Sequence, residues 1–225
     1  MLDLLDAFIK KQPSSPHIVR LFSPLVYLVV GASADERQLS DKAKGILKSR
    51  IGKSKESPSG VQADHVLSAL SDIHTYARKA HSSDLLTTLS PCSIYLSRIL
   101  LNLGAEKSLL EIYRQSLIDF ITRKSSGLNT SFFQDFIRRC PTSAWSLRDD
   151  ILDLSTRAVN LYRQCQTYQL AGVLITQLPA MVSISCPTFE ISLNSNSGQY
   201  SAERPFKLHD LASEIFADGC NECMQ

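Results

Sequence analysis

The stretch SPCSIYLSRILLNLGAEKSLLEIYRQSLIDFITRK, residues 90–124, decides the fold class, because it reads as two amphipathic helices joined by a short turn. Ser90 and Pro91 are typical of an N-cap and a first helical residue, and Gly104 is typical of a helix end. Each half has one apolar face, which predicts helix-on-helix packing. The apolar residues are Leu96, Ile99, Leu100 and Leu103 in the first half, and Leu109, Leu110, Tyr113, Leu117, Phe120 and Ile121 in the second.

The same helical spacing extends outward from this stretch in both directions, and no segment alternates convincingly as a strand would. Prolines, serines and glycines separate the stripes, which predicts roughly eight helices up to about residue 177. The last stripe fits one long helix or two nearly collinear helices. Besides the quoted stretch, the stripes occupy residues 2–9, 18–29, 39–51, 66–80, 132–137 and 147–165.

Pairs of helices with short loops, at a period of roughly 40 residues, are the pattern of a HEAT-like or armadillo-like α-solenoid. We therefore predict an all-α helical-repeat domain over residues 1–177. The array starts at residue 1 with a helix that needs a neighbour, so we expect the chain to be a piece of something longer. From residue 178 onward the helical stripe stops, which predicts a disordered or weakly docked tail over residues 178–225.

The composition narrows the functional classes. The formal net charge is +2, with 24 Lys and Arg against 22 Asp and Glu, which is too balanced for a protein that coats phosphate with bulk charge. The six cysteines lack the spacing of a disulfide framework, so we expect reduced thiols in an intracellular compartment. Residues 1–10 do not resemble a signal peptide, and the longest apolar run, Leu25 to Val30, is too short to cross a bilayer. We expect a soluble protein.

The cysteines give only a weak indication of a metal or redox site. Cys220 and Cys223 have the separation that such sites use, but a zinc ion needs a second ligand pair. Cys186 and His209 are the only nearby candidates for that pair. An incidental pair in the tail is the better interpretation, so we predict no metal and no cofactor.

Three histidines share the helix predicted over residues 66–80 and its flanks, namely His65, His74 and His81. At about 100° per residue, only His74 and His81 lie on one face, and two turns separate them. That distance is too long for one metal ion to bridge. We therefore interpret all three as solvated or cap-proximal side chains.

The acidic residues Asp149, Asp150 and Asp153 are the cluster most compatible with catalysis, because a two-metal mechanism needs converging carboxylates. Arg148 and Arg157 lie near them, however, and an acidic first turn complements a helix N-terminus. A solvated helix start is therefore the better interpretation. The sequence contains no nucleophile elbow, no phosphate-binding Gly-rich loop and no plausible Cys–His pair, so we predict no catalytic residue.

The main electrostatic feature is a basic segment on the third predicted helix and the exposed loop after it. A solvated face balanced by Asp41 and Glu56 explains this segment, and binding to a nucleic-acid backbone is the functional alternative. Arg138 and Arg139 form a smaller basic spot, which the dipole of a helix end explains. The predicted nucleic-acid-binding residues are Lys44, Lys48, Arg50, Lys53 and Lys55.

Several segments resemble one known family. Ser90–Gly104, Ile112-Tyr113 and Thr130–Phe136 are similar to the C-terminal part of the DNA polymerase phi family, the nucleolar proteins that include Myb-binding protein and the fungal "fifth DNA polymerase". Leu25–Lys48 and Ala158–Leu170 fit the same pattern, so the resemblance spans roughly residues 1–175. The similar residues are packing patterns and not catalytic signatures.

The resemblance implies a nucleolar helical-repeat scaffold in rRNA gene transcription and ribosome biogenesis. Its expected partners are pre-ribosomal or transcription-associated proteins and rDNA or rRNA, with no membrane and no small-molecule substrate. Residues 178–225 depart from the family, whose C-termini are lysine-rich. Two alternatives stay open: an enzyme, either a DNA-directed DNA polymerase as the family name suggests or a hydrolase, and a helical adaptor unrelated to ribosomes.

Overall fold

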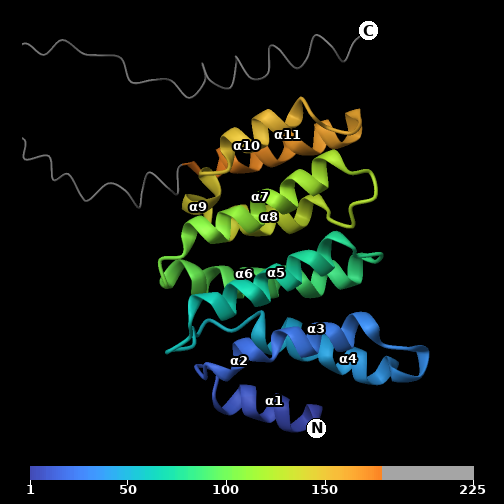
Figure 1. Ribbon diagram of the computed structural model, residues 1–225, viewed down its shortest axis with the longest axis vertical. Helices are drawn as coiled ribbons and strands as arrows, with labels where there is room; N and C mark the ends of the chain where they lie inside the picture. The colour runs from blue at the N-terminus through green and yellow to red at the C-terminus, as the bar shows by residue number, and fades with distance from the viewer. Residues whose placement is uncertain (179–225) are drawn as a thin grey trace, which may run out of the picture. The chain divides into compact units, whose positions relative to one another are not determined.

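The computed structural model describes residues 1–178, and these residues form helices, turns and loops without a strand (Figure 1). No helix in this part of the chain is both long and apolar enough to cross a membrane. From residue 179 onward the predicted tail lies outside the described residues, together with Cys186, His209, Cys220 and Cys223. The α-helices are α1 (Leu2–Lys11), α2 (His17–Arg20), α3 (Phe22–Gly31), α4 (Arg37–Gly45), α5 (Ala63–Arg78), α6 (Ser83–Asn102), α7 (Glu106–Thr122), α8 (Thr130–Arg139), α9 (Pro141–Trp145), α10 (Arg148–Ser155) and α11 (Leu161–Thr176).

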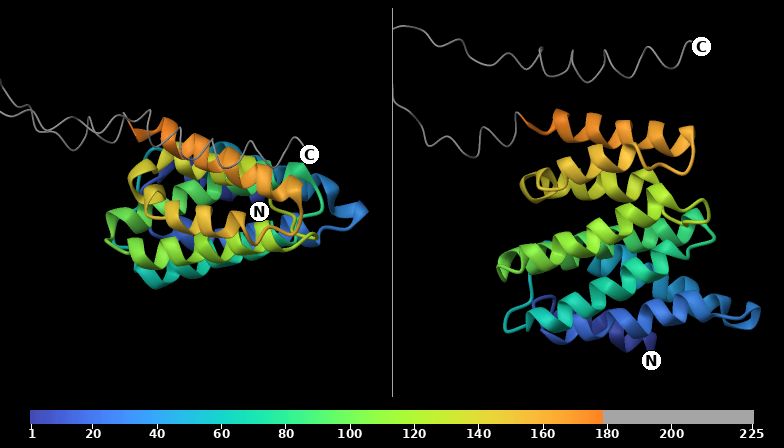
Figure 2. Two further views of the ribbon diagram at one scale, coloured as in Figure 1. Left: turned by 90° about the horizontal axis from the view of Figure 1, so that it is seen from above. Right: turned by 45° about the horizontal axis from the view of Figure 1, so that its top comes forward.

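The helices stack in two layers, and each helix contacts the next one in its layer (Figures 1 and 2). The first layer contains α2 with α3, then α5, α7 and α10. The second layer contains α4 with the π-helical turn η2 (Ile46–Ile51), then α6, α8 and α11, and α1 packs against its beginning. The first-layer helices begin at intervals of 46, 43 and 42 residues. The all-α solenoid predicted from the sequence is confirmed.

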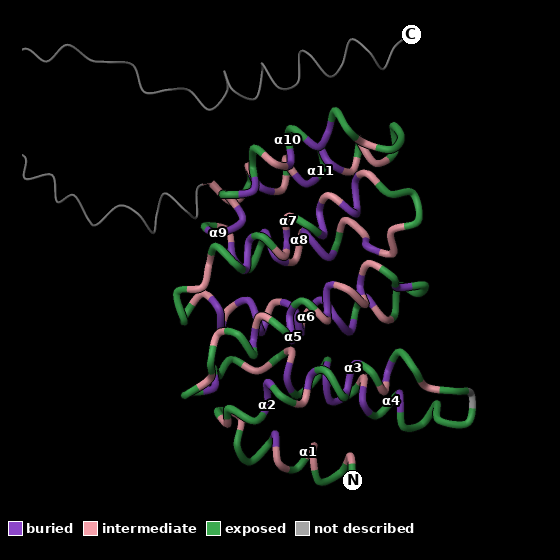
Figure 3. The backbone as a smooth tube through the Cα atoms, in the orientation of Figure 1, coloured by how far each residue is buried: buried purple, intermediate pink, exposed green. Residues whose placement is uncertain are grey.

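The hydrophobic core lies where the stacked helices meet, and buried positions recur along each long helix (Figure 3). Helices α7 and α8 meet through aromatic rings: Tyr113 stacks on Phe136 at 3.7 Å between centroids, and Phe120 lies 5.2 Å from Phe133. Truncating a ring in a close-packed core costs about 3–5 kcal/mol. The largest fully buried side chains also include Phe22, Tyr95, Leu47, Leu70, Leu89 and Leu96.

Helix α6 begins eight residues before the start predicted at Ser90 and Pro91, so that prediction is wrong. The side chain of Ser82 caps the helix instead, by accepting the backbone N–H of Leu85 at 3.3 Å. Pro91 inside the helix cannot donate to the carbonyl of Thr87, but Thr87 is exposed, so solvent can satisfy that carbonyl. Burial of leucines in the extra turns outweighs the missing bond.

The stripe over residues 147–165 forms two helices that lie side by side and are not collinear, which corrects the sequence prediction (Figure 1). The chain turns back between α10 and α11. In this turn the backbone N–H of Val159 donates to the carbonyl of Ile121 at 3.1 Å, and the side chain of Asn160 caps α11 by accepting the N–H of Arg163 at 2.8 Å. The fold-back completes the fourth helix pair.

The helix predicted over residues 39–51 ends in a widened turn. In η2 the backbone N–H of Gly52 donates to the carbonyl of Leu47, five residues earlier, at 2.8 Å. The thiol of Cys92 on α6 donates to the same carbonyl at 3.6 Å. A Cβ on Gly52 would lie 2.8 Å from the Cβ of Pro91, so η2 and α6 can approach this closely because residue 52 is glycine.

Candidate functional site

The basic segment predicted to bind nucleic acid lies on α4, η2 and the loop that follows. Two of its five cations are already paired. The ammonium Nζ of Lys44 lies 2.9 Å from Oδ2 of Asp84, and Nε of Arg50 donates to Oδ1 of Asp6 at 2.8 Å. Within residues 1–178 the three remaining cations form no ion pair, and all three are exposed: Lys48, Lys53 and Lys55.

Helix α1 supplies carboxylates that pair with Arg50 of this segment and with the neighbouring Lys42. Asp3 pairs with Lys42, and Asp6 pairs with both Lys10 and Arg50. Hydrogen bonds from these cations hold the pKa of both carboxyl groups below its usual value. Local sequence patterns do not indicate Asp3 and Asp6 as partners of Lys42 and Arg50, because about forty residues separate them along the chain. Part of the basic segment is therefore a contact surface for α1.

The partners expected from the sequence, Asp41 and Glu56, contribute less. Oδ1 of Asp41 lies 3.5 Å from Nζ of Lys44, whereas Glu56 accepts a hydrogen bond from Ser14 at 2.6 Å. The stronger contact of Lys44 is with Asp84, and that hydrogen bond raises the pKa of the ammonium.

The three histidines separate into two kinds. His65 and His81 are exposed, as expected, but His74 is 1% exposed, so its interpretation as a solvated side chain is wrong. Burial lowers the pKa of His74 to about 3, with a smaller effect from the charge of Arg78, so the imidazole is neutral. The periodicity could have indicated this burial, because His74 lies four residues after Leu70 and three before Ala77, which are both buried.

Both ring nitrogens of His74 have partners. Nδ1 lies 2.8 Å from Oγ of Ser116 on α7, and Nε2 lies 3.0 Å from Oγ of Ser93 on α6. Ser93 continues to the hydroxyl of Tyr113 at 2.7 Å, and Ser97 lies 3.2 Å from the same hydroxyl. Each of these side chains is at most 1% exposed, so the network joins three helices and is closed to a substrate.

The acidic cluster does not converge. Both carboxylate oxygens of Asp150 lie 3.0 Å from Nε of Arg114 on α7, and Asp149 pairs with its neighbour Arg148. Asp153 is exposed at the next turn. Among residues 1–178, no three His, Cys, Asp or Glu side chains meet as metal ligands would. Asp149 and Asp150 lie in the first turn of α10. Asp150 also contacts Arg114 of the preceding repeat, which the sequence did not indicate.

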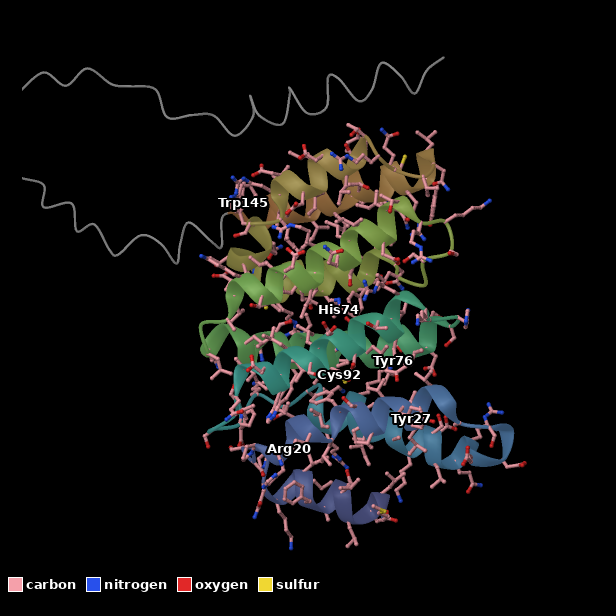
Figure 4. The ribbon with its side chains drawn as sticks, viewed as in Figure 1. Arg20, Tyr27, His74, Tyr76, Cys92 and Trp145 are labelled. Atoms are coloured by element: carbon pink, nitrogen blue, oxygen red, sulfur yellow. The ribbon has the colours of Figure 1, made fainter. Side chains whose placement is uncertain are left out.

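The outer side of the first layer has a shallow groove between α2–α3 and α5. Two adjoining hollows of about 270 and 260 Å³ share Val19, Arg20 and His65. Two turns after Arg20, Tyr27 is 69% exposed on α3, and Figure 4 shows both side chains on the lower part of this layer. Arg20 lines the groove, whereas Tyr27 lies farther along α3, outside its lining. An exposed arginine and an exposed tyrosine are typical of anchor positions for a protein partner. Neither Arg20 nor Tyr27 was predicted from the sequence as a binding residue.

Comparison with known proteins agrees with the architecture. A model of the family described as "Myb-binding protein 1A-like, TPR repeats" matches residues 12–183, which is more than half of the chain. The matched region extends from the end of α1 through α11. Neither the curated proteins nor the solved structures include a significant match. The repeat intervals of 42 to 46 residues are longer than the period of about 34 that is usual for TPR repeats.

Proposed function

The chain belongs to the Myb-binding protein 1A-like family of helical-repeat proteins, and on this basis we propose that it is a nucleolar scaffold for proteins of rRNA gene transcription and ribosome assembly. A protein-binding role is the general role of such repeats. The nucleolar setting is supported by the resemblance of Ser90–Gly104 and Thr130–Phe136 to the DNA polymerase phi proteins.

The observation that carries this proposal is the two-layer stack itself. The inner face of each helix is used for packing on its neighbours, and the only buried polar network in residues 1–178 that joins several helices, around His74, is closed to substrates. What the array offers to other molecules is the outer surface of its layers. Extended surfaces of this kind bind protein partners through a few anchor side chains.

The surface of α2 and α3 that carries Arg20, which lines the groove, and Tyr27, farther along α3, is the part that we expect to contact a protein partner first. An aromatic ring that is 69% exposed buries a large apolar area when a partner covers it, at little cost in side-chain entropy. The guanidinium of Arg20 can add hydrogen bonds at the rim. In residues 1–178, Arg20 forms no ion pair, so it is available for this contact.

The experiment is a tagged full chain expressed in nucleated cells, with imaging and affinity capture followed by mass spectrometry. We expect nucleolar signal and enrichment of pre-ribosomal or rRNA-transcription proteins. Exclusion of the chain from nucleoli, or capture of no such protein, would contradict the proposal.

A matched pair of variants tests the groove. The double change Arg20→Ala with Tyr27→Ala should lose part of the captured set. The control is Arg157→Ala with Tyr162→Ala, because Tyr162 is 68% exposed, almost the same as Tyr27. Equal losses in both double variants would mean that the groove is not the anchor.

A further inference from the structure

A second group of cations surrounds a cleft of about 410 Å³ where α6 ends beside the junction of α8 and α9. The charged lining residues are Lys55 from the loop after η2, Arg98 from α6 and Arg139 from the end of α8. Among residues 1–178, no carboxylate lines this cleft. The polar lining residues are Ser57, Asn102, Thr142 and Ser143.

The cleft is partly organised without a ligand. The guanidinium of Arg98 donates to the backbone carbonyl of Ser54 at 2.6 Å and lies 5.9 Å from the centroid of the Tyr95 ring. Nδ2 of Asn102 donates to Oγ of Ser57 at 3.2 Å, which ties the loop to the end of α6. These contacts fix one cation and two polar groups, so a ligand has less to order when it binds.

The three positive charges in the cleft, on Lys55, Arg98 and Arg139, have no carboxylate partner within residues 1–178. Arg98, Arg139 and Cys140 line the same cleft, and burial raises the pKa of the Cys140 thiol to about 11 against the opposing effect of the two arginines. Like charges gathered in this way repel each other, and an anion between them removes the repulsion.

The structure assigns to this cleft the binding of a phosphorylated serine or threonine side chain of a protein partner. A phosphomonoester carries nearly two negative charges near pH 7 and three acceptor oxygens. Two guanidinium groups, one ammonium and nearby hydroxyls supply matching donors, and clusters of arginine are a recurrent means of phosphopeptide recognition. The assignment rests on the proposed protein-binding function and names a chemical class of partner for it.

A phosphopeptide fits the surroundings better than RNA does. A nucleic-acid backbone needs cations along a continuous track. On the neighbouring surface, however, Lys42, Lys44 and Arg50 are paired with carboxylates of Asp3, Asp84 and Asp6. Within residues 1–178, Lys48 and Lys53 are unpaired as well, but neither lines the cleft. Lys55, Arg98 and Arg139 surround one compact site, which suits one phosphate group.

The test measures fluorescence anisotropy of the full chain with a labelled degenerate peptide pool that carries a central phosphoserine. The same pool without phosphate and a single-stranded RNA are measured in parallel. We expect the phosphorylated pool to bind at least about tenfold more tightly than the unphosphorylated pool, a difference of about 1.4 kcal/mol. Inorganic phosphate should compete for the site.

Variants locate the site. Arg139→Gln and Lys55→Gln should each weaken phosphopeptide binding several-fold, whereas Arg138→Gln, next along α8 but outside the cleft lining, should not. Equal binding of both peptide pools, or equal effects of Arg138→Gln and Arg139→Gln, would overturn the assignment. So would RNA that binds more tightly than the phosphopeptide and is weakened by the same two variants. If phosphopeptide binding is absent while nucleolar proteins are still captured, this inference fails and the proposed function stands.

Discussion

His74 on α5 and Ser116 on α7 are joined by a hydrogen bond of 2.8 Å, although they lie 42 residues apart in the chain. This separation is almost the interval of 43 residues between the starts of α5 and α7, so the two residues occupy nearly equivalent positions in successive repeats. The opposite ring nitrogen reaches Ser93 on α6. One neutral imidazole thus connects both layers and two repeats.

Stability should fall in mild acid because of His74. Its pKa is about 3 in the folded chain and about 6.5 when unfolded, so the unfolded state binds more protons between these values. The stability that the neutral imidazole contributes is complete above pH 6.5 and is lost as the pH falls toward 3. The loss at pH 5 is about 2 kcal/mol. Urea unfolding at pH 5 and pH 8 measures it. His74→Gln should remove most of the difference, whereas His65→Gln, at an exposed position, should retain it.

Ser116→Ala should destabilise the chain by about 1–3 kcal/mol, because it leaves Nδ1 of a buried imidazole without a partner. Ser108→Ala on the same helix is the control, since Ser108 is exposed. Denaturant midpoints of the two variants provide the comparison. A Ser116→Ala protein as stable as the Ser108→Ala protein would show that the network around His74 adds little.

Gly127→Ala should lower stability by about 1–3 kcal/mol or more through steric overlap. A Cβ at this position would lie 2.2 Å from the carbonyl oxygen of Ala80, and the backbone N–H of Gly127 already donates to the carbonyl of Arg78 at 2.8 Å. Gly172→Ala on α11 should have the opposite sign, about 0.5–1 kcal/mol stabilising, because that position is helical and open. Thermal melts of both variants test the pair.

Asp150→Asn should reduce stability by about 0.5–1 kcal/mol, because it removes a partly exposed contact with Arg114 between two repeats. Asp153→Asn, at an exposed position, should change little. The polymerase alternative makes a different prediction: loss of nucleotide incorporation when Asp149, Asp150 or Asp153 is replaced by alanine. An incorporation assay on the purified chain and these variants distinguishes the two roles.

The basic segment should affect nucleic-acid binding only through its unpaired cations. We expect Lys48→Gln with Lys53→Gln to weaken binding to duplex DNA and to reduce the slope of log K against log salt by about 2, since each lost phosphate contact contributes about 0.9. Lys44→Gln with Arg50→Gln should change the slope less, because both side chains already pair with carboxylates. Identical slopes in all three proteins would remove the nucleic-acid hypothesis for this segment.

The sequence predicted those features of the fold that depend on residues close together along the chain. Helical spacing around Leu96, Leu109 and Phe133 is a local property, so the helices and their pairing into a solenoid followed from it. The start of α6 did not follow, because a Ser-Pro pair is a strong local start signal, and leucine burial against other helices outweighed it.

The candidate site was less predictable, because its contacts join distant parts of the chain. The pairing of Arg50 with Asp6 and of Asp150 with Arg114 depends on which helices become neighbours. The burial of His74 depends on serines from two other helices that satisfy its nitrogens. Lys55 was singled out from its local charge, but its two arginine neighbours around the cleft could be found only in the folded chain.

The seam between η2 and α6 has a mechanical consequence. On one side of this seam, the π-helical turn η2 ends at Gly52. On the other side, in contact with Gly52, lies the turn of α6 in which Pro91 lacks a backbone N–H. Two locally weakened ladders therefore meet between the first and second repeats, whereas the junction of α5, α6 and α7 is reinforced by hydrogen bonds from His74. We expect bending and amide exchange to concentrate at that seam, so that a partner seated across it could alter the curvature of the array while leaving the later repeats rigid.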